Sequence, residues 1–590
     1  MPETGENINP LRRQEFFFWL CAYAAVLVFL GSNALFGPEA LVAEAAREIV
    51  VSRDWNPVCI NFQPFQELHP LNVCSIALLY IGLGISEFTT RLIAAVTALI
   101  LFSGVRRLAV LLFDRRTALI AGWLALGTYS VLYLGRSAGD CIPACAAVVW
   151  AVAWYLGTSA PMGFTRALIF YLLLFFAAVL YGNWFLLPLG FLLPGWIDER
   201  SLRGALSLRG VAALLIVAGL GFLWWVKSGG GGGLFALRFD PAAVREALAA
   251  ALRGLGDSYL AKRWKIFLGP LDILRVLLPW TLLALAAGVT AARRFKTAAP
   301  KEKMLWQGAA AMFATMLVLP TYQWRLLMPL LPFLVLMTAH GFTGEADDPC
   351  RRGALFITRA ALMAAAALGA VSPAALPVLT PLLKFELPLV VIPTCTVTGI
   401  AVLAIMFLDS YPGMPLCRLS GLPARLNSIV LGGTLITVGV VSLILPALRD
   451  MRGEKPFLRG LRKELSEFNP ANVIFIGDAR QTAALLFYTG MKSSVSPIPI
   501  GDEKRFSEIV ERNRGGRLAV ISRNRDGEGR ELDFLRRCAE LNNFKADTAN
   551  PALSEELTPF GDPDKRIVFF MIPVPGKTPP ETVTSTAKEK

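Results

Sequence analysis

Long apolar segments alternate with short polar ones along the first 450 residues of the chain. A run of about 20 apolar residues can cross a lipid bilayer as a helix. Backbone groups in lipid must pair internally, which leaves helices or closed barrels. The pattern therefore predicts an α-helical polytopic membrane protein with about thirteen transmembrane helices. The predicted spans are 15–36, 87–105, 117–134, 141–157, 164–181, 183–197, 209–226, 271–292, 306–320, 324–342, 354–371, 387–408 and 427–447.

The pattern changes after about residue 450, where short apolar runs of strand length alternate with amphipathic segments. Strands are predicted at 472–476, 495–500, 518–521 and 566–572, with helices up to Tyr488 and at 503–512 and 529–541. Strands that alternate with helices indicate a small α/β domain. We therefore divide the chain into a membrane domain, an α/β domain and a disordered tail rich in Pro, Thr, Lys and Glu. Their bounds are 1–450, 451–575 and 576–590.

The charge distribution predicts the orientation of the chain in the membrane. Only 17% of the residues are charged, against about 25% in soluble proteins. The net charge of +14 would suggest nucleic acid as the partner of a soluble protein. Here most of the excess lies in alternate short loops, which the positive-inside rule places in the cytoplasm. The N-terminus is then cytoplasmic, and the first loop, the 227–270 loop and the α/β domain are extracytoplasmic, with no role for nucleic acid.

The first outer loop carries polar groups that are costly to keep at a membrane surface unless they have a function. Glu39 follows Pro38 in the first turn of a predicted helix, where proline and a carboxylate are both favoured. It either starts that helix or serves the function. His69 in the same loop is either structural or part of the site.

Other charged residues lie where predicted spans meet the outer surface. Arg136 and Asp140 are four residues apart, so they can pair on a helical turn or serve the function. Arg325 can snorkel to lipid headgroups or bind a phosphate through its guanidinium group. Lys262 and Arg263 belong either to a basic helix on the lipid surface or to a phosphate site. The histidines and cysteines show no metal-ligand spacing, so we predict neither a metal nor a cofactor.

Several short motifs, taken in order, resemble those of the C-type membrane glycosyltransferases, and in particular the bacterial protein O-mannosyltransferases and lipid A aminoarabinose transferases. The resemblance extends over essentially the whole chain. One departure is that the family usually has an Asp-Glu pair where this chain has Pro38-Glu39. The motifs are Pro38-Glu39-Ala40, Ser52-Arg53-Asp54-Trp55, His69-Pro70-Leu71, Ser86-Glu87-Phe88 with Arg91-Leu92, Arg136 with Asp140, Arg325 with Met328-Pro329-Leu330-Leu331-Pro332, and Leu486-Phe487-Tyr488-Thr489-Gly490.

The resemblance implies an enzyme of the bacterial inner membrane with a periplasmic C-terminal domain. Its donor would be a polyprenyl-phosphate-linked sugar, and its acceptor an extracytoplasmic lipid, glycan or protein. Transfer would proceed with inversion at the anomeric carbon. The acceptor-side or catalytic carboxylates would be Glu39 and Asp140. The groups that bind substrate, mainly its phosphate, would be Arg53, His69, Arg136, Lys262, Arg263 and Arg325.

Two other functions are compatible with the sequence. One is a catalytically degenerate relative that binds lipid-linked sugar without turnover, because the usual first carboxylate is replaced by Pro38. The other is a lipid or sugar flippase, which would have polar groups and broken helices near the bilayer midplane.

Overall fold

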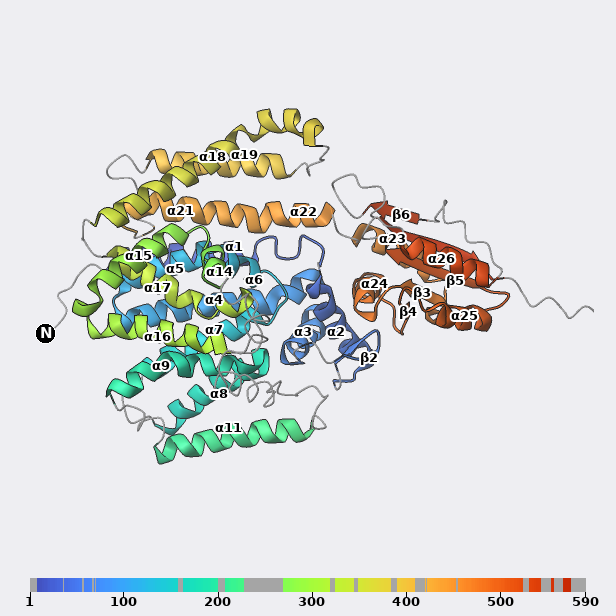
Figure 1. Cartoon of the computed structure of the whole chain (residues 1–590), viewed down its shortest axis with the longest axis horizontal. Helices are drawn as coiled ribbons and strands as arrows, with labels where there is room; N and C mark the ends of the chain where they lie inside the picture. Colours follow the sequence, from blue (N-terminus) through green and yellow to red (C-terminus); the bar gives the residue numbers. More distant parts are fainter. Residues whose placement is uncertain are drawn as a thin grey trace, which may run out of the picture.

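The structure is a computed structural model of the whole chain. It describes residues 8–35, 37–55, 58–65, 68, 70–157, 163–199, 207–227, 269–318, 324–343, 348–383, 390–408, 420, 422–451, 455–523, 530–542, 553–556 and 566–574. Helices make up the part before residue 451 and lie side by side in a broad bundle (Figure 1). The N-terminal helices are α1 (Ile8–Leu27), α2 (Pro38–Ser52), α3 (Pro70–Leu83), α4 (Glu87–Leu112), α5 (Arg115–Gly127), α6 (Tyr129–Gly135), α7 (Cys141–Leu156), α8 (Phe164–Tyr181), α9 (Leu186–Glu199) and α11 (Leu208–Lys227).

The second group of helices completes the bundle. Its members are α14 (Gly269–Val276), α15 (Thr281–Arg294), α16 (Pro300–Val318), α17 (Leu331–Thr343), α18 (Pro349–Leu383), α19 (Val391–Leu408), α21 (Ala424–Gly439) and α22 (Leu445–Met451). Five helices within the described residues are long and apolar enough to cross a membrane, or six if the bent pair α5–α6 is one span. A mostly helical protein with several candidate membrane spans is therefore confirmed. The number of thirteen spans stays a prediction.

Small residues let the central helices approach closely. A Cβ atom added to Gly104 of α4 would lie 3.0 Å from the Trp150 ring of α7. The surrounding core is rich in alanine, with Ala95, Ala98 and Ala144 fully buried. Without a hydrophobic driving force between helices in lipid, such close backbone packing is a main source of association.

The predicted span 117–134 is broken. Helices α5 and α6 meet at an angle of 67° at Thr128. Polar partners satisfy the backbone at the break, as they must inside a bundle. The Tyr129 amide donates to the Leu278 carbonyl at 2.9 Å, and the Thr437 hydroxyl donates to the Gly127 carbonyl at 3.0 Å. The bend directs the chain after α6 into the loop 136–140, which is part of the site described below.

The C-terminal part is an α/β unit built on a five-stranded sheet of order β4-β3-β5-β7-β6. Strands β4, β3 and β5 are parallel, and β7 and β6 are antiparallel to their neighbours. One face of the sheet is covered by a hydrophobic cluster that includes Phe506 and Phe534. The other face is covered by a cluster that includes Phe457 and Leu486. The elements are α23 (Lys455–Leu465), β3 (Val473–Ile476), α24 (Thr482–Thr489), β4 (Ser496–Ile498), α25 (Glu503–Arg512), β5 (Arg517–Arg523), α26 (Arg530–Leu541), β6 (Leu553–Glu556) and β7 (Arg566–Pro573).

The four predicted strands and three predicted helices of this unit are all present within a few residues of the expected positions. The sequence analysis missed α23 and β6. Residues 455–465 are dominated by charges, and residues 553–556 form a short edge strand with two glutamates. The domain boundaries at 450 and 575, and the extracytoplasmic location, stay predictions.

Helices α2 and α3 lie between the bundle and the α/β unit (Figure 1). With them lies a short hairpin of β1 (Cys59–Ile60) and β2 (Gln63–Pro64), whose turn residues Asn61 and Phe62 both have φ of 57°. The Asn61 side chain exchanges two hydrogen bonds of 2.9 Å with the backbone of Val495. The Leu35 amide donates to the Tyr488 hydroxyl at 2.8 Å. These contacts fix the α/β unit on the first loop.

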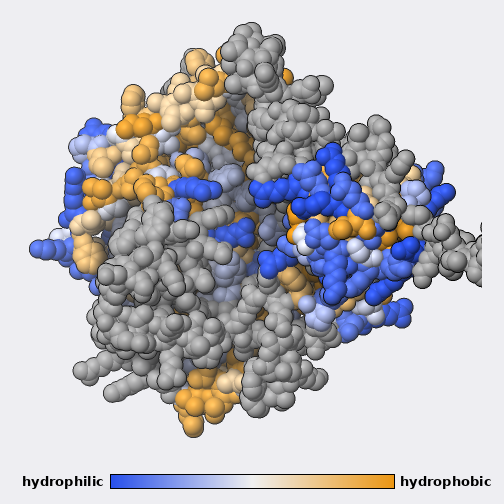
Figure 2. All heavy atoms as spheres, turned by 45° about the vertical axis from the view of Figure 1, so that its right-hand side comes forward, coloured by the Kyte–Doolittle hydropathy of each residue, from blue (hydrophilic) through white to orange (hydrophobic). Residues whose placement is uncertain are grey.

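The surface changes character between the two parts. In Figure 2 the helical part shows broad hydrophobic areas, whereas hydrophilic residues dominate the α/β unit. Large apolar side chains such as Phe16, Phe356 and Val397 are about 70% exposed on the bundle. An apolar surface of this extent is stable in lipid and costly in water.

Candidate active site at the end of the bundle next to the α/β unit

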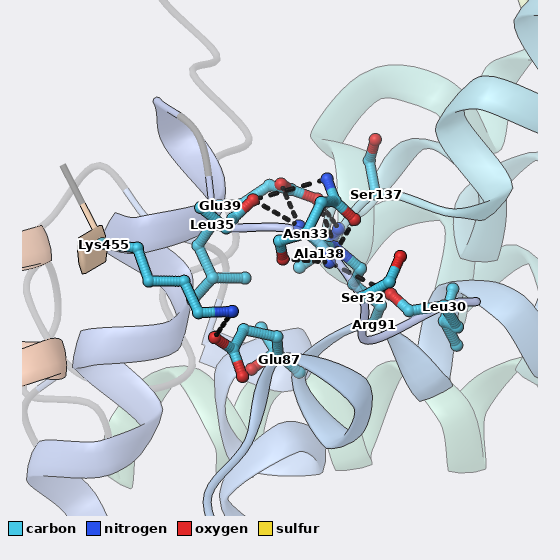
Figure 3. A network of polar contacts seen from close by, with 12 residues as sticks. Leu30, Ser32, Asn33, Leu35, Glu39, Glu87, Arg91, Ser137, Ala138 and Lys455 are labelled. Carbon is cyan, nitrogen blue, oxygen red and sulfur yellow. Dashed lines mark hydrogen bonds and ion pairs between the residues drawn. The ribbon is translucent and has the colours of Figure 1, made fainter. Parts of the chain in front are cut away.

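The centre of the site is an ion pair between Glu39 of α2 and Arg91 of α4. Arg91 donates to the two Glu39 oxygens from Nε at 3.2 Å and from Nη2 at 3.0 Å. Both side chains are buried. Figure 3 shows the pair and the contacts around it. Such a two-pronged bond between guanidinium and carboxylate fixes geometry as well as charge.

Arg91 also binds the segment that joins α1 to α2. Its Nη1 donates to the Leu30 carbonyl, the Asn33 carbonyl and the Asn33 side chain at 3.0–3.1 Å. Its Nη2 donates to the Ala34 carbonyl at 2.9 Å. These acceptors replace the water that the buried guanidinium loses. Arg91 therefore holds the first outer segment against α4.

Glu39 in turn binds the loop that ends at Asp140. Its Oε1 accepts a hydrogen bond of 3.0 Å from the amide of Ala138. In the same loop, Arg136 donates from Nη1 to the carbonyls of Ala25 and Val26 at 2.8 and 3.0 Å. Those carbonyls belong to the last turn of α1, where a cation is favoured by the helix dipole. The loop is thus held by buried charges at its first residue, Arg136, and at its middle residue, Ala138.

Asp140 and Arg325 are close to each other in space, although 184 residues separate Cys141 from Arg325. The charges of Asp140 and Arg325 both act on the Cys141 thiol and on the Tyr181 hydroxyl. The thiols of Cys141 and Cys145 point to the carbonyls of Arg325 and Met328 at 3.9 and 3.4 Å. The segments that carry Asp140 and Arg325 therefore lie side by side at the start of α7.

A second set of buried charges lies farther along α2. Arg47 donates to both oxygens of Glu44 at 2.6–2.7 Å and to the Met491 carbonyl at 2.8 Å. Burial raises the pKa of Glu44 to about 8, against the lowering effect of Arg47. Burial also raises the pKa of Glu48, whose carboxylate accepts a 2.8 Å hydrogen bond from the Phe62 amide. This set stabilises the contact of the first loop with the α/β unit.

The predicted site residues thus divide into three groups. The segments of Asp140 and Arg325 contact each other, and Glu39 contacts the loop that carries Asp140. Arg136 is occupied by backbone carbonyls of α1, and Arg53 is exposed at the end of α2 with φ of 60°. The predicted residues His69, Lys262 and Arg263 lie outside the described residues.

The sequence analysis gave Arg91 no role, although it quoted the residue in a motif. The position of Arg91 near the start of an apolar helix could have indicated its role, because a buried arginine there needs a partner. Within the described part of the chain, no group of three or more His, Cys, Asp or Glu residues could hold a metal ion. The absence of a metal requirement stays a prediction.

No known protein-family model matches the sequence, and no curated protein matches it. The fold, in contrast, matches solved structures. It is similar to ArnT from Cupriavidus metallidurans bound to undecaprenyl phosphate, with a TM-score of 0.64 and 14% identity over 94% of this chain and 97% of that one. The apo state of ArnT gives a TM-score of 0.62, with 15% identity over the same shares of the two chains.

ArnT is a lipid A aminoarabinose transferase with the fold of the C-type glycosyltransferases. The chain therefore has this fold along nearly its whole length, and the expected resemblance to these enzymes is confirmed at the level of structure.

Proposed function

We propose that the protein is a membrane glycosyltransferase that moves a sugar from a polyprenyl-phosphate donor to an extracytoplasmic acceptor. The main support is the contact between the segments that carry Asp140 and Arg325, in a chain with the ArnT fold. ArnT binds undecaprenyl phosphate, and the donor proposed here has the same kind of lipid phosphate. We place the enzyme in the bacterial inner membrane, with the α/β unit in the periplasm.

The proposed reaction forms a bond between an acceptor oxygen and the anomeric carbon while the bond from that carbon to the lipid phosphate breaks. Arg325 would stabilise the negative charge on the departing phosphate, since fixed cations act most strongly where charge develops. Asp140 would take the proton of a hydroxyl acceptor. Attack opposite the leaving phosphate inverts the anomeric centre.

Glu39 would act as a positioning residue in this mechanism. Its oxygens already accept hydrogen bonds from Arg91 and from the amide of Ala138. It would hold the loop 136–140 so that Asp140 faces the acceptor. Arg136 would support the same loop from α1. A direct role of the Glu39 carboxylate, and phosphate binding by Arg53, His69, Lys262 and Arg263, stay predictions.

The test is release of polyprenyl phosphate from a synthetic polyprenyl-phosphate sugar by the full-length protein in detergent, with phosphate and hydroxyl acceptors offered in parallel. Asp140→Asn should lower the rate about 10²- to 10⁴-fold with a hydroxyl acceptor. Arg325→Gln should lower the rate with either acceptor. Glu508→Gln, a matched change of an exposed carboxylate on α25, should leave the rate unchanged.

Two outcomes would contradict the proposal. Bound donor without release for any acceptor would favour the degenerate, lipid-binding alternative. Movement of the intact donor across vesicles without release would favour a flippase.

A further inference from the structure

A cavity with a positively charged wall lies where the first loop meets the α/β unit. Its volume is about 630 Å³, within the range of small-molecule sites. Its wall is formed by the ends of α2 and α24, the start of α4, and α23. The charged residues that line it are Arg47, Glu87, Arg459, Arg462 and Lys492.

The pairing of these charges leaves a positive excess inside the cavity. Arg47 is bound by Glu44. Glu87 is bound by Lys455 at 2.7 Å and by Arg459 at 3.3 Å, and the first of these pairs is drawn in Figure 3. Glu44 and Glu87 therefore each already have a cationic partner.

Two cations of the cavity wall remain available to a ligand. Arg462 and Lys492 are exposed, and within the described residues neither side chain makes a hydrogen bond or ion pair. Arg462 lies on α23 and Lys492 lies in the segment after α24, so both cations reach the cavity from the α/β unit. Arg459 adds a guanidinium group held 6.0 Å from the centre of the Tyr488 ring.

We propose that this cavity is a second anion site, which binds a phosphate carried by a lipid headgroup or by a sugar. Phosphate matches the wall because arginine offers a planar pair of N–H donors and lysine a mobile point charge. Phe487 and Tyr488 give the cavity an apolar side, against which a sugar ring or glycerol can pack. Arg53 and Arg325, proposed above for the donor phosphate, are absent from the lining residues.

The proposal does not depend on the transferase activity, so its test measures binding alone. Full-length protein is analysed by native mass spectrometry after incubation with dioleoyl phosphatidic acid or dioleoyl phosphatidylcholine. The test variant is Arg462→Ser/Lys492→Ser. The control variant, Lys504→Ser/Arg512→Ser, removes the same charge from exposed positions of α25 that do not line the cavity.

The wild type should retain phosphatidic acid in preference to phosphatidylcholine. The test variant should lose about tenfold in apparent affinity for phosphatidic acid, as expected for two partly exposed charge-assisted contacts. The apparent affinity of the control variant for phosphatidic acid should stay within about twofold of the wild-type value, because exposed charges away from the cavity contribute little. Since all four positions are exposed, these variants should fold.

A competition experiment distinguishes the two sources of phosphate. Displacement of phosphatidic acid by glucose 1-phosphate would identify a site open to phosphorylated sugars. Persistence of the lipid against this competitor would identify a headgroup site. The proposal is overturned if the test variant retains phosphatidic acid like the wild type, or if the control variant loses as much as the test variant.

Discussion

Replacing Glu39 with glutamine should destabilise the membrane part of the chain, because the change removes one partner of a buried ion pair. Glutamine has nearly the same shape, so the effect is one of charge and hydrogen bonding. Its carbonyl oxygen can still accept from Ala138. Its amide nitrogen would face Nη2 of Arg91, which lies 3.0 Å from the native Glu39 oxygen, and two donors would then oppose each other.

The size of the effect follows from the burial of Arg91. Breaking a buried pair from one side costs about 3–5 kcal/mol, because the remaining charge is left uncompensated. Arg91 keeps its contacts with Leu30, Asn33 and Ala34. These carbonyls still solvate the guanidinium group, so we expect the lower end, about 3 kcal/mol.

The assay is thermal unfolding in detergent. Unfolding is measured by the labelling of the buried thiols of Cys141 and Cys145 as they become accessible, and mass spectrometry identifies which thiol is labelled. A loss of about 3 kcal/mol should lower the midpoint by roughly 2–4 °C, because the unfolding entropy grows with the size of the unit. Glu15→Gln provides the matched control. Its pair with Arg106 is also short, at 2.9 Å, but the glutamate is 49% exposed, so the expected cost is about 0–1 kcal/mol.

A double-mutant cycle separates the ion pair from other effects. In an Arg91→Met background the buried cation is gone, so Glu39→Gln should cost less than it does in the wild type. If Glu39→Gln moves the midpoint no more than Glu15→Gln does, the ion pair does not stabilise the fold and the reasoning fails.

Three further changes test other parts of the structure. Burial raises the pKa of Glu44 from 4.5 to about 8, so between these pH values the folded state binds more protons than the unfolded state. Thermal stability should therefore fall as the pH rises through this window, and Glu44→Gln should flatten this dependence of stability on pH. Gly127→Ala would place a Cβ 2.5 Å from the Thr434 hydroxyl and should cost about 1–3 kcal/mol in the same thiol assay. Glu87→Gln weakens the contacts with Lys455 and Arg459, so hydrogen exchange should increase in α23, while the core strand β3 should keep its protection.

The regular elements could be predicted where local pattern decides them. The apolar run of β3 and the proline and glutamate that begin α2 are local features, and both elements form where they were expected. The break at Thr128 could not be predicted in this way. Its two partner groups, the Leu278 carbonyl and the Thr437 hydroxyl, come from distant segments, so nothing between 117 and 134 marks the bend.

The candidate site shows the same division between local and distant information. Charged residues at the ends of apolar helices could be recognised one by one. Their partners could not be assigned. Arg136 was expected either to pair with Asp140 or to serve the function, but the guanidinium donates to carbonyls of α1, and a backbone acceptor leaves no trace in the sequence pattern.

The contacts of Glu39 bear on the class of acceptor. The chain has Pro38 where the enzymes that its motifs resemble usually have a first carboxylate, and Glu39 is bound by Arg91 and Ala138. In the proposed mechanism, Asp140 is then the carboxylate left to take a proton. A hydroxyl acceptor needs that base, whereas a phosphate acceptor is already anionic. Asp140→Asn should therefore lower the rate of transfer to a hydroxyl about 10²- to 10⁴-fold and largely spare transfer to a phosphate. Equal losses with both acceptors would show that Asp140 binds the donor instead.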